Sequence, residues 1–389
     1  MGERPMDETM AGRLERVAPR ARRFLAAPTG DCGRALESTG GCGPPGERDV
    51  AAIAGQLRRA QSDRPAAPGS GGDAVAQGVA RDLVTRARQA LETLQESKGD
   101  AALDADDAMA LESVLRSRGR PALRVEGDSI EPIDDQKHPG SGMWRNFLDD
   151  FEANMLFAAA ATGAVIVGEG SGESAGPWVQ GTAWLVRSDL AVTNRHLLFP
   201  PPGGIRLAQR MLLQPTGARL RSDLDLLIDF AFDSGPSRSV RYAIDEVTFV
   251  AEEGDPVDVA LLKVRPMDGR RPAPLALRTA LLDEKHVYVV GHPGRMRQVA
   301  KEVRAVFGDP DERKRVSFGE LMDPDALHPG ELTYDASTIG GFSGGCVLGF
   351  RSREVAGLHH YGDPLSGNRA IAAATLAGHA AGGHILGEA

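Results

Sequence analysis

Two hydrophobic patterns divide the chain into regions. Over residues 74–118, apolar side chains recur at spacings of three and four, which is the spacing of one helical face. A break at Lys98-Gly99-Asp100 separates two such stretches, and glycine suits the end of a helix. The pattern predicts a small α-helical hairpin at 74–118. It would serve either as an adaptor that binds a protein partner or as a brace on the main domain.

From about residue 151 the pattern changes to short apolar or alternating runs separated by turn residues. A short helix is expected at about 146–161, and no long helix follows it. Many short strands with this punctuation predict an all-β sandwich or barrel. The expected strands cover 164–168, 181–186, 190–193, 224–230, 257–264, 287–291, 345–350 and 355–360.

The remaining segments lack a regular pattern. Residues 1–73 are rich in Pro, Gly and Arg, which predicts a disordered segment. Residues 119–150 are expected to form a linker to a main domain at 151–372. A C-terminal helix or tail is expected at 373–389.

Composition limits the classes of function. A net charge of −9 argues against a nucleic-acid partner, which needs clustered Lys and Arg. Three cysteines form no disulfide framework, and no apolar run reaches the roughly 20 residues that span a membrane. Charges interrupt the N-terminal residues, so no secretory signal core is recognised. We therefore expect a cytoplasmic protein with free thiols, no cofactor and no membrane partner.

Three segments together carry a recognisable chemistry. His196 follows two apolar strands, Asp258 opens a third, and Ser343 lies in a glycine-rich turn before another strand. Each feature alone is weak. The order His, Asp, Ser, however, belongs to one fold solution for nucleophilic catalysis by serine.

The chemistry explains these residue types. A serine hydroxyl attacks when an imidazole accepts its proton, and a carboxylate orients that imidazole and stabilises its cation. Glycines around the serine let backbone N–H groups converge on the oxyanion. We assign those donors to Gly341 and Ser343.

Residues 160–370 resemble the trypsin-like peptidases, and in particular the bacterial glutamyl endopeptidases. The resemblance rests on the segments TNRH, DVALLKV, VVGHPG, YDASTIGGFSGG and VAGLHH. It implies a chymotrypsin-like double six-stranded β-barrel, with an N-barrel at about 160–270 and a C-barrel at about 275–372. It also implies a serine endopeptidase that acts on protein or peptide substrates.

The same resemblance implies a specificity pocket. His359 and Thr338 match the residues that bind an acidic P1 side chain, while Gln or Asp at P1 stays open. Ser337 lies at the pocket base, and because it is not Asp it argues against Arg or Lys. The main chain of His360, Tyr361 and Gly362 is expected to pair with an extended substrate.

One departure concerns activation. Phe342 precedes the nucleophile, where secreted trypsin relatives have an Asp that receives the freed N-terminal amine. That activation route is therefore absent. Some 150 residues precede the protease domain, which predicts a regulated intracellular protease.

Three other interpretations were weighed. The pattern Gly-Phe-Ser-Gly-Gly at 341–345 also fits an α/β-hydrolase nucleophile turn, but too few residues follow it. An inactive protease fold used as a binding module is the alternative function. A metal site is not expected, because solvated side chains explain the C-terminal histidines better. The histidines considered were His359, His360, His379 and His384.

Overall fold

The computed structural model describes most of the chain beyond residue 119. The predicted segments 1–73 and 74–118 lie outside the described residues, as do Cys32 and Cys42. The described ranges are 120–134, 136–138, 141–169, 177–200, 205–234, 238–294, 306–307, 311–324, 328–363 and 367–387.

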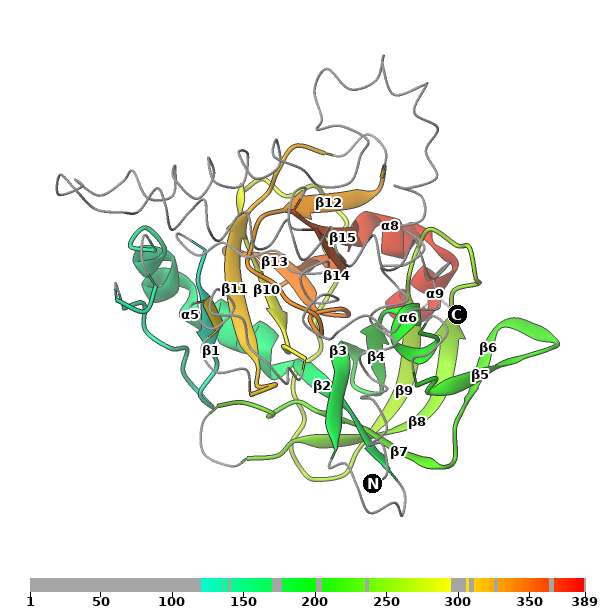
Figure 1. Ribbon diagram of the computed structural model, residues 1–389. Coiled ribbons are helices and arrows are strands. Elements are labelled where there is room, and N and C mark those ends of the chain that lie inside the picture. The colour runs from blue at the N-terminus through cyan, green and yellow to red at the C-terminus, as the bar shows by residue number, and fades with distance from the viewer. Residues whose placement is uncertain are drawn as a thin grey trace, which may run out of the picture. The chain divides into compact units, whose positions relative to one another are not determined.

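The first sheet closes into a barrel. Its strand order is β5-β6-β8-β7-β2-β3-β4-β9, and a further pairing of β8 with β9 completes a ring of six strands. The β5–β6 hairpin extends beyond this ring (Figure 1). The bounds are β2 Thr162–Glu169, β3 Trp178–Arg187, β4 Leu190–Thr193, β5 Ala208–Met211, β6 Gln214–Leu220, β7 Leu224–Asp229, β8 Arg241–Val250 and β9 Ala260–Pro266.

The second sheet curves into a half barrel. Its order is β1-β11-β10-β13-β14-β15-β12, and a bridge between Leu321 and Tyr334 joins the end of β11 to β12. The bounds are β1 Ala122–Arg124, β10 His286–Gly291, β11 Arg315–Glu320, β12 Glu331–Tyr334, β13 Cys346–Gly349, β14 Val355–Asp363 and β15 Gly367–Ala372. The predicted all-β, double-barrel fold is confirmed.

The segment 119–150, predicted to be a linker, contains strand β1 and the start of helix α5 (Trp144–Ala160). Its strand β1 pairs antiparallel with β11. The described chain therefore contributes a strand to the second sheet before it forms the first sheet. Helix α5 follows, and its Trp144 ring stacks on Phe350 with ring centroids 5.8 Å apart. The start of the described chain is thus packed into the core.

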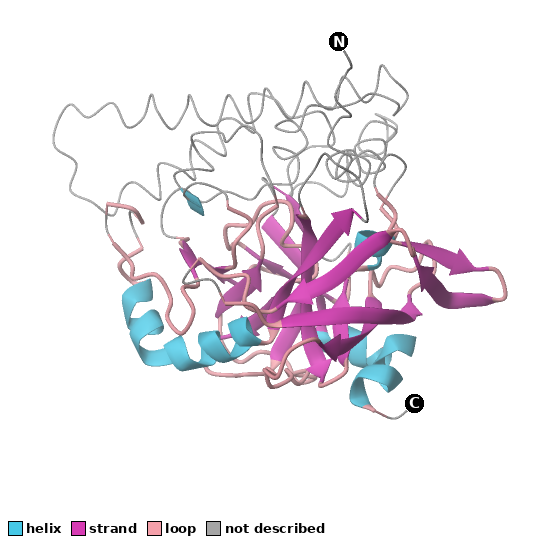
Figure 2. Cartoon of the chain, turned by 90° about the horizontal axis from the view of Figure 1, so that it is seen from below, coloured by secondary structure: helices cyan, strands magenta, loops and turns pink. Residues whose placement is uncertain are grey.

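The C-terminal helices return to the first barrel. Helix α8 (Ala373–Gly378) follows β15, and α9 (Ala380–Leu386) comes next. The rings of His379 and His384 lie 5.7 and 5.9 Å from that of Phe249 in β8. Figure 2 shows these short helices against a body made mostly of strands.

A single apolar cluster runs through both barrels. It includes Trp184 and Leu261 of the first barrel and Tyr288, Leu348 and Leu358 of the second, all fully buried. Burial of this area is the main favourable term that holds the two barrels together. No helix in the described part of the chain is long and apolar enough to cross a membrane.

Candidate active site

His196 is delivered by the first barrel. The four residues of β4 are all buried, and the strand pairs with β3 and β9. Asn194 is extended, and the short helix α6 (Arg195–Leu198) then begins, which puts His196 in its first turn. The rigid strand fixes where the imidazole leaves the barrel.

Asp258 lies two residues before β9 and holds His196 at two points. The carboxylate Oδ2 contacts the ring Nδ1, and the backbone N–H of His196 donates to Oδ1 at 3.0 Å. The Asn194 side chain also donates to the Asp258 carbonyl at 2.9 Å. Both the ring and the backbone of this histidine are therefore oriented by one loop.

The Asp258 carboxyl stays ionised in this environment. Burial by itself would raise its pKa, but the charge and hydrogen bond of His196, with the charges of Arg195 and His360, outweigh burial. The pKa is held well below its usual range. An ionised partner on Nδ1 favours an imidazole whose Nε2 is free to take up a proton.

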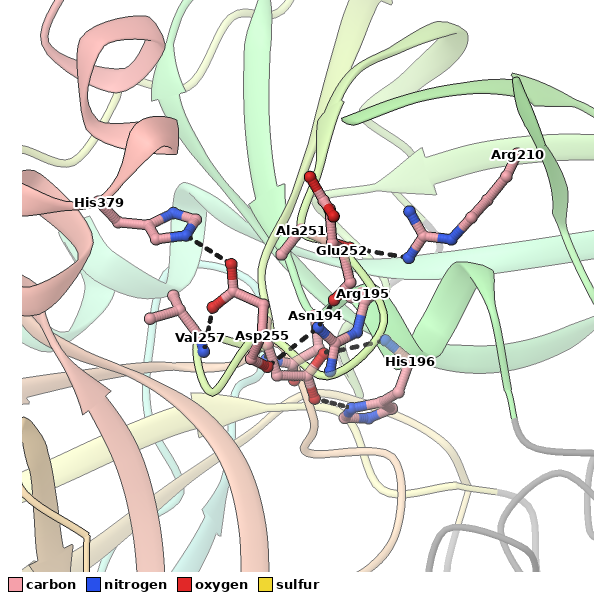
Figure 3. A network of polar contacts seen from close by, with 10 residues as sticks. Asn194, Arg195, His196, Arg210, Ala251, Glu252, Asp255, Val257 and His379 are labelled. Atoms are coloured by element: carbon pink, nitrogen blue, oxygen red, sulfur yellow. Dashed lines mark hydrogen bonds and ion pairs between the residues drawn. The ribbon is translucent and has the colours of Figure 1, made fainter. Parts of the chain in front are cut away.

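The loop that precedes Asp258 has its own supports, which sequence reasoning missed (Figure 3). Arg195 donates through Nη1 to the carbonyls of Glu252 and Asp255. Asp255 in turn binds His379 at 3.0 Å between Oδ2 and Nε2. Only an observed fold could reveal this set, because a lone Arg or His carries no pattern.

The Ser343 turn is bonded to β3 of the first barrel. Thr182 donates its backbone N–H to the Ser343 carbonyl and its Oγ1–H to the Gly341 carbonyl, both at 2.9 Å. Its Oγ1 also accepts the N–H of His292 at 3.0 Å. Thr182, another residue that the sequence did not single out, therefore joins the barrels at this turn.

Gly341 and Gly344 give the turn its shape. Both adopt a positive φ, at 101° and 88°, which a side chain would strain. Among the described residues, the N–H groups of Gly341 and Ser343 donate to no acceptor. The two predicted oxyanion donors therefore have no backbone acceptor within the described chain.

Gly181 is the point where the histidine and serine segments meet. A Cβ atom there would lie 2.5 Å from Cδ2 of Leu197, the neighbour of His196, and 3.1 Å from the carbonyl O of Ser343. Within the described chain, no hydrogen bond joins the half-buried Ser343 side chain to His196 Nε2. Such bonds often tighten only in the substrate complex.

His359 of β14 is a buried, neutral imidazole next to this turn. Its backbone exchanges hydrogen bonds with the turn: its N–H donates to Gly345 at 2.8 Å, and its carbonyl accepts from Gly344 at 2.9 Å. Burial, with the charges of His360 and His196, lowers the pKa of His359 to about 3.

The tautomer of His359 follows from Tyr334. The phenol oxygen lies 2.7 Å from Nδ1, and burial raises the pKa of Tyr334 well above its usual value. A protonated phenol with no other partner in the described chain donates to Nδ1. The hydrogen of the neutral ring therefore sits on Nε2, which has no partner among the described residues.

The other predicted pocket residues are engaged inside the protein. Thr338 donates its hydroxyl hydrogen to Asn368 Oδ1, and Asn368 donates to the Ala336 carbonyl at 2.6 Å. Ser337 donates to the Arg120 carbonyl at 2.9 Å. In this structure Thr338 can meet a ligand only as an acceptor, which differs from its expected part as a donor.

Strand β14, which contains the segment predicted to bind the substrate main chain, continues past the end of its pairing with β13. The β13–β14 register ends at Cys346–Leu358, whereas β14 continues to pair with β15 as far as Asp363. The His360 Nε2 lies 3.1 Å from Glu331 Oε1, and Arg369 covers the Tyr361 ring at 4.7 Å. Gly362 pairs with Asn368.

Two other chemistries have little support here. Burial raises the pKa of the Cys346 thiol to about 12, so it does not supply a thiolate. Within the described residues, no group of three His, Cys, Asp or Glu side chains is arranged to hold a metal ion.

Comparison with known proteins identifies a trypsin-like peptidase domain in this chain. The model of the trypsin-like peptidase domain matches residues 181–358. A probable serine protease of Lysobacter enzymogenes is 30% identical over 294 residues, which cover 68% of this chain and 72% of that protein.

Two solved structures have lower similarity. The inactive form of Rv3671c protease is 14% identical with a TM-score of 0.34, over 58% of this chain and 89% of that one. Deg5 is 16% identical with a TM-score of 0.36, over 59% and 91%.

A histidine–aspartate pair from one β-barrel, next to a glycine-bounded serine turn of another, defines the class as a double-barrel hydrolase. The match to the trypsin-like peptidase domain and the Lysobacter enzymogenes relative identify the family within that class. The chain belongs to the trypsin-like serine peptidases.

Proposed function

We propose that the protein is an endopeptidase whose catalytic triad is His196, Asp258 and Ser343. The observation that carries this proposal is the junction at Gly181. There β3 contacts Leu197, next to the Asp258-bound histidine, and also the Ser343 carbonyl.

In the proposed reaction, Ser343 Oγ attacks the scissile carbonyl carbon while His196 Nε2 takes the hydroxyl proton. The ionised Asp258 stabilises the imidazolium that forms. His196 then protonates the leaving amine as the C–N bond breaks. Water, deprotonated by the same imidazole, hydrolyses the acyl-enzyme and regenerates Ser343.

The N–H groups of Gly341 and Ser343 are proposed to bind the oxyanion. Their lack of an internal acceptor in the described chain supports this role. Removing one such donor typically costs about 3 kcal/mol of transition-state stabilisation.

We further propose that the enzyme cuts after Glu. The Nε2–H of His359 is a buried donor with no partner in the described chain, and an anionic side chain can hydrogen-bond to it and favour its protonation. A neutral donor also suits an amide, so Gln is the competing P1 residue. Ser337 supplies no negative charge for Arg or Lys.

Finally, we propose that the N-terminal region regulates the enzyme inside the cell. Phe342 is fully buried with its ring 6.0 Å from that of Phe307, so this position offers no carboxylate to an N-terminal amine. Instead Arg120 makes two hydrogen bonds to Asp335, at 2.8 and 2.9 Å, and accepts one from Ser337. The segment that leads out of 1–119 is therefore bonded to the wall of the proposed pocket.

A P1-varied peptide library tests the function. Purified full-length protein should cleave peptides with P1 Glu, and Ser343→Ala should lose about 10⁴-fold or more in kcat. The variant Ser352→Ala, in the half-buried connection between β13 and β14, serves as a matched serine control and should keep full activity.

The outcomes separate the parts of the proposal. Equal cleavage by Ser343→Ala would overturn the mechanism. Cleavage after Arg or Lys would overturn the specificity, and a preference for Gln would replace Glu. A protein that binds peptides without cutting them would be the binding module considered above.

A further inference from the structure

The loop from Ala251 to Asp258 is held at its outer side by the C-terminal helix. Figure 3 shows His379, at the start of α9, pointing to Asp255, while Arg195 reaches the same loop from the side of His196. These residues come from three separate parts of the chain. None of them belongs to the proposed triad.

The two ring nitrogens of His379 have different partners. Nδ1 accepts the backbone N–H of Ala381 at 3.2 Å, which caps helix α9. The ring hydrogen therefore belongs to Nε2, and this nitrogen donates to Asp255 Oδ2 at 3.0 Å. One side chain thus joins the helix start to the loop.

Asp255 connects His379 to the backbone next to Asp258. Its Oδ1 accepts the N–H of Val257 at 2.8 Å, one residue before Asp258. Burial would raise the pKa of Asp255, but the Val257 N–H, with the hydrogen bond and charge of His379, lowers it. The ionised carboxylate is fixed on both sides, and the backbone that leads into Asp258 is fixed with it.

Arg195 is the second support of the same loop. Its guanidinium binds the carbonyls of Glu252 and Asp255, and its Nε lies 3.9 Å from Asp258 Oδ1. Because Arg195 directly precedes His196, it joins the loop to the histidine. The loop that carries Asp258 is therefore held between Arg195 and His379.

We propose that His379 is a positioning residue for the reaction, an inference that rests on the proposed function. Through Asp255 it holds the loop so that Asp258 stays on Nδ1 of His196. Displacement of α9 would release the loop and slow acylation of Ser343. The C-terminal helix is then part of what keeps the enzyme competent.

Two substitutions at one position separate the two bonds of His379. The Asn oxygen in His379→Asn can replace Nδ1 and keep the helix cap, but it cannot reach Asp255. The Gln amide in His379→Gln can replace Nε2 and keep the donor to Asp255. His384→Ala, in the same helix and without an ion pair to the loop, is the matched control.

The measurement is the rate of labelling by a fluorophosphonate, which phosphonylates a reactive serine with loss of fluoride, whatever the P1 preference. His379→Asn should label about tenfold or more slowly than the wild type. His379→Gln and His384→Ala should stay near the wild-type rate. With a cleaved peptide, the loss should fall on kcat and leave KM nearly unchanged.

A second variant protects the test against a folding defect. Asp255→Asn keeps an oxygen for Val257 but repels the His379 donor, so it should slow labelling to a similar degree. Combined with His379→Asn it should add little, because both remove one interaction. Thermal melting checks that each variant is folded.

The outcomes are distinguishable from a failure of the proposed function. A wild type that does not label, or a Ser343→Ala that does, refutes the triad. Normal labelling by the wild type and by His379→Asn refutes only the positioning role. A slow His379→Gln beside a fast His379→Asn would show that the helix cap alone matters.

Discussion

At the scale of single residues, chemistry depends on environments that composition does not reveal. The sequence singled out His196, Asp258 and Ser343 from their order. The structure adds that Asp258 bonds the histidine at both ring and backbone. His359 is buried with its Nδ1 2.7 Å from the Tyr334 phenol oxygen, and burial lowers its pKa to about 3.

The buried His359 predicts a dependence of stability on pH. Its pKa in the folded protein, about 3, is lower than the usual 6.5, so the unfolded chain binds the proton more tightly. Its contribution is fully present above pH 6.5 and is lost as the pH falls toward 3. Between pH 6.5 and 4.5 the loss should be about 2–3 kcal/mol.

Urea unfolding at several pH values measures this effect. His359→Gln removes the titrating group and keeps a polar side chain, so its free energy of unfolding should fall less steeply over the same range. Other buried groups, such as His292, titrate in both proteins and cancel in the difference. Parallel curves would contradict the prediction.

At the scale of elements, the close contact between β3 and the serine turn leaves no room for a side chain at Gly344. A Cβ atom at Gly344 would lie 1.9 Å from the Thr182 carbonyl O and 2.6 Å from Thr193 Oγ1. Backbone atoms cannot move aside as a flexible side chain can. The glycine is therefore required by packing as well as by its positive φ.

Gly344→Ala should unfold the site, and Gly127→Ala is its matched control. Both residues have a positive φ, at 88° and 70°, but a Cβ at Gly127 would meet only the end of the Arg238 side chain, at 3.7 Å. The control should lose about 1–2 kcal/mol of stability and keep its activity. Gly344→Ala should lose several kcal/mol more, by urea unfolding, and lose all fluorophosphonate labelling. Equal losses in the two variants would argue against the close contact.

The predicted strands correspond to β2, β3, β4, β7, β9, β10, β13 and β14. Some of the strands that were not predicted have weak signals, although β8 reads RYAIDEVTFV and carries a strong one. β15 reads GNRAIA and β6 reads QPTGARL, with glycine, proline or polar residues in place of an apolar run. They are strands because their neighbours pair with them, and such tertiary pairing overrides local preference.

At the scale of the whole molecule, a buried lysine joins the two barrels. Lys314, just before β11, donates to the carbonyls of Ala159 and Phe230 at 2.7 and 2.6 Å. Its Nζ also lies 3.1 Å from Asp233 Oδ1. Burial lowers the pKa of Lys314 and raises that of Asp233, so each needs the other in order to stay charged.

Removing the ammonium should be costly. Lys314→Met leaves Asp233 and two carbonyls without their partner, and it should lower the free energy of unfolding by about 3–5 kcal/mol. Adding Asp233→Asn removes the unpaired charge and should recover part of that loss. A double-mutant cycle in urea measures the coupling, and strict additivity would show that the pair is unimportant.

The sequence by itself determined eight of the fifteen strands in the described chain and the order of the three proposed catalytic residues. These signals are local, since alternation and glycine-rich turns follow from the backbone near them. The tertiary structure decided what sits around those residues: Thr182 on the serine turn, Tyr334 on His359, and His379 on the loop before Asp258. Each of these contacts joins residues distant in the chain. Their geometry depends on how two barrels and a returning helix pack, which no local pattern encodes.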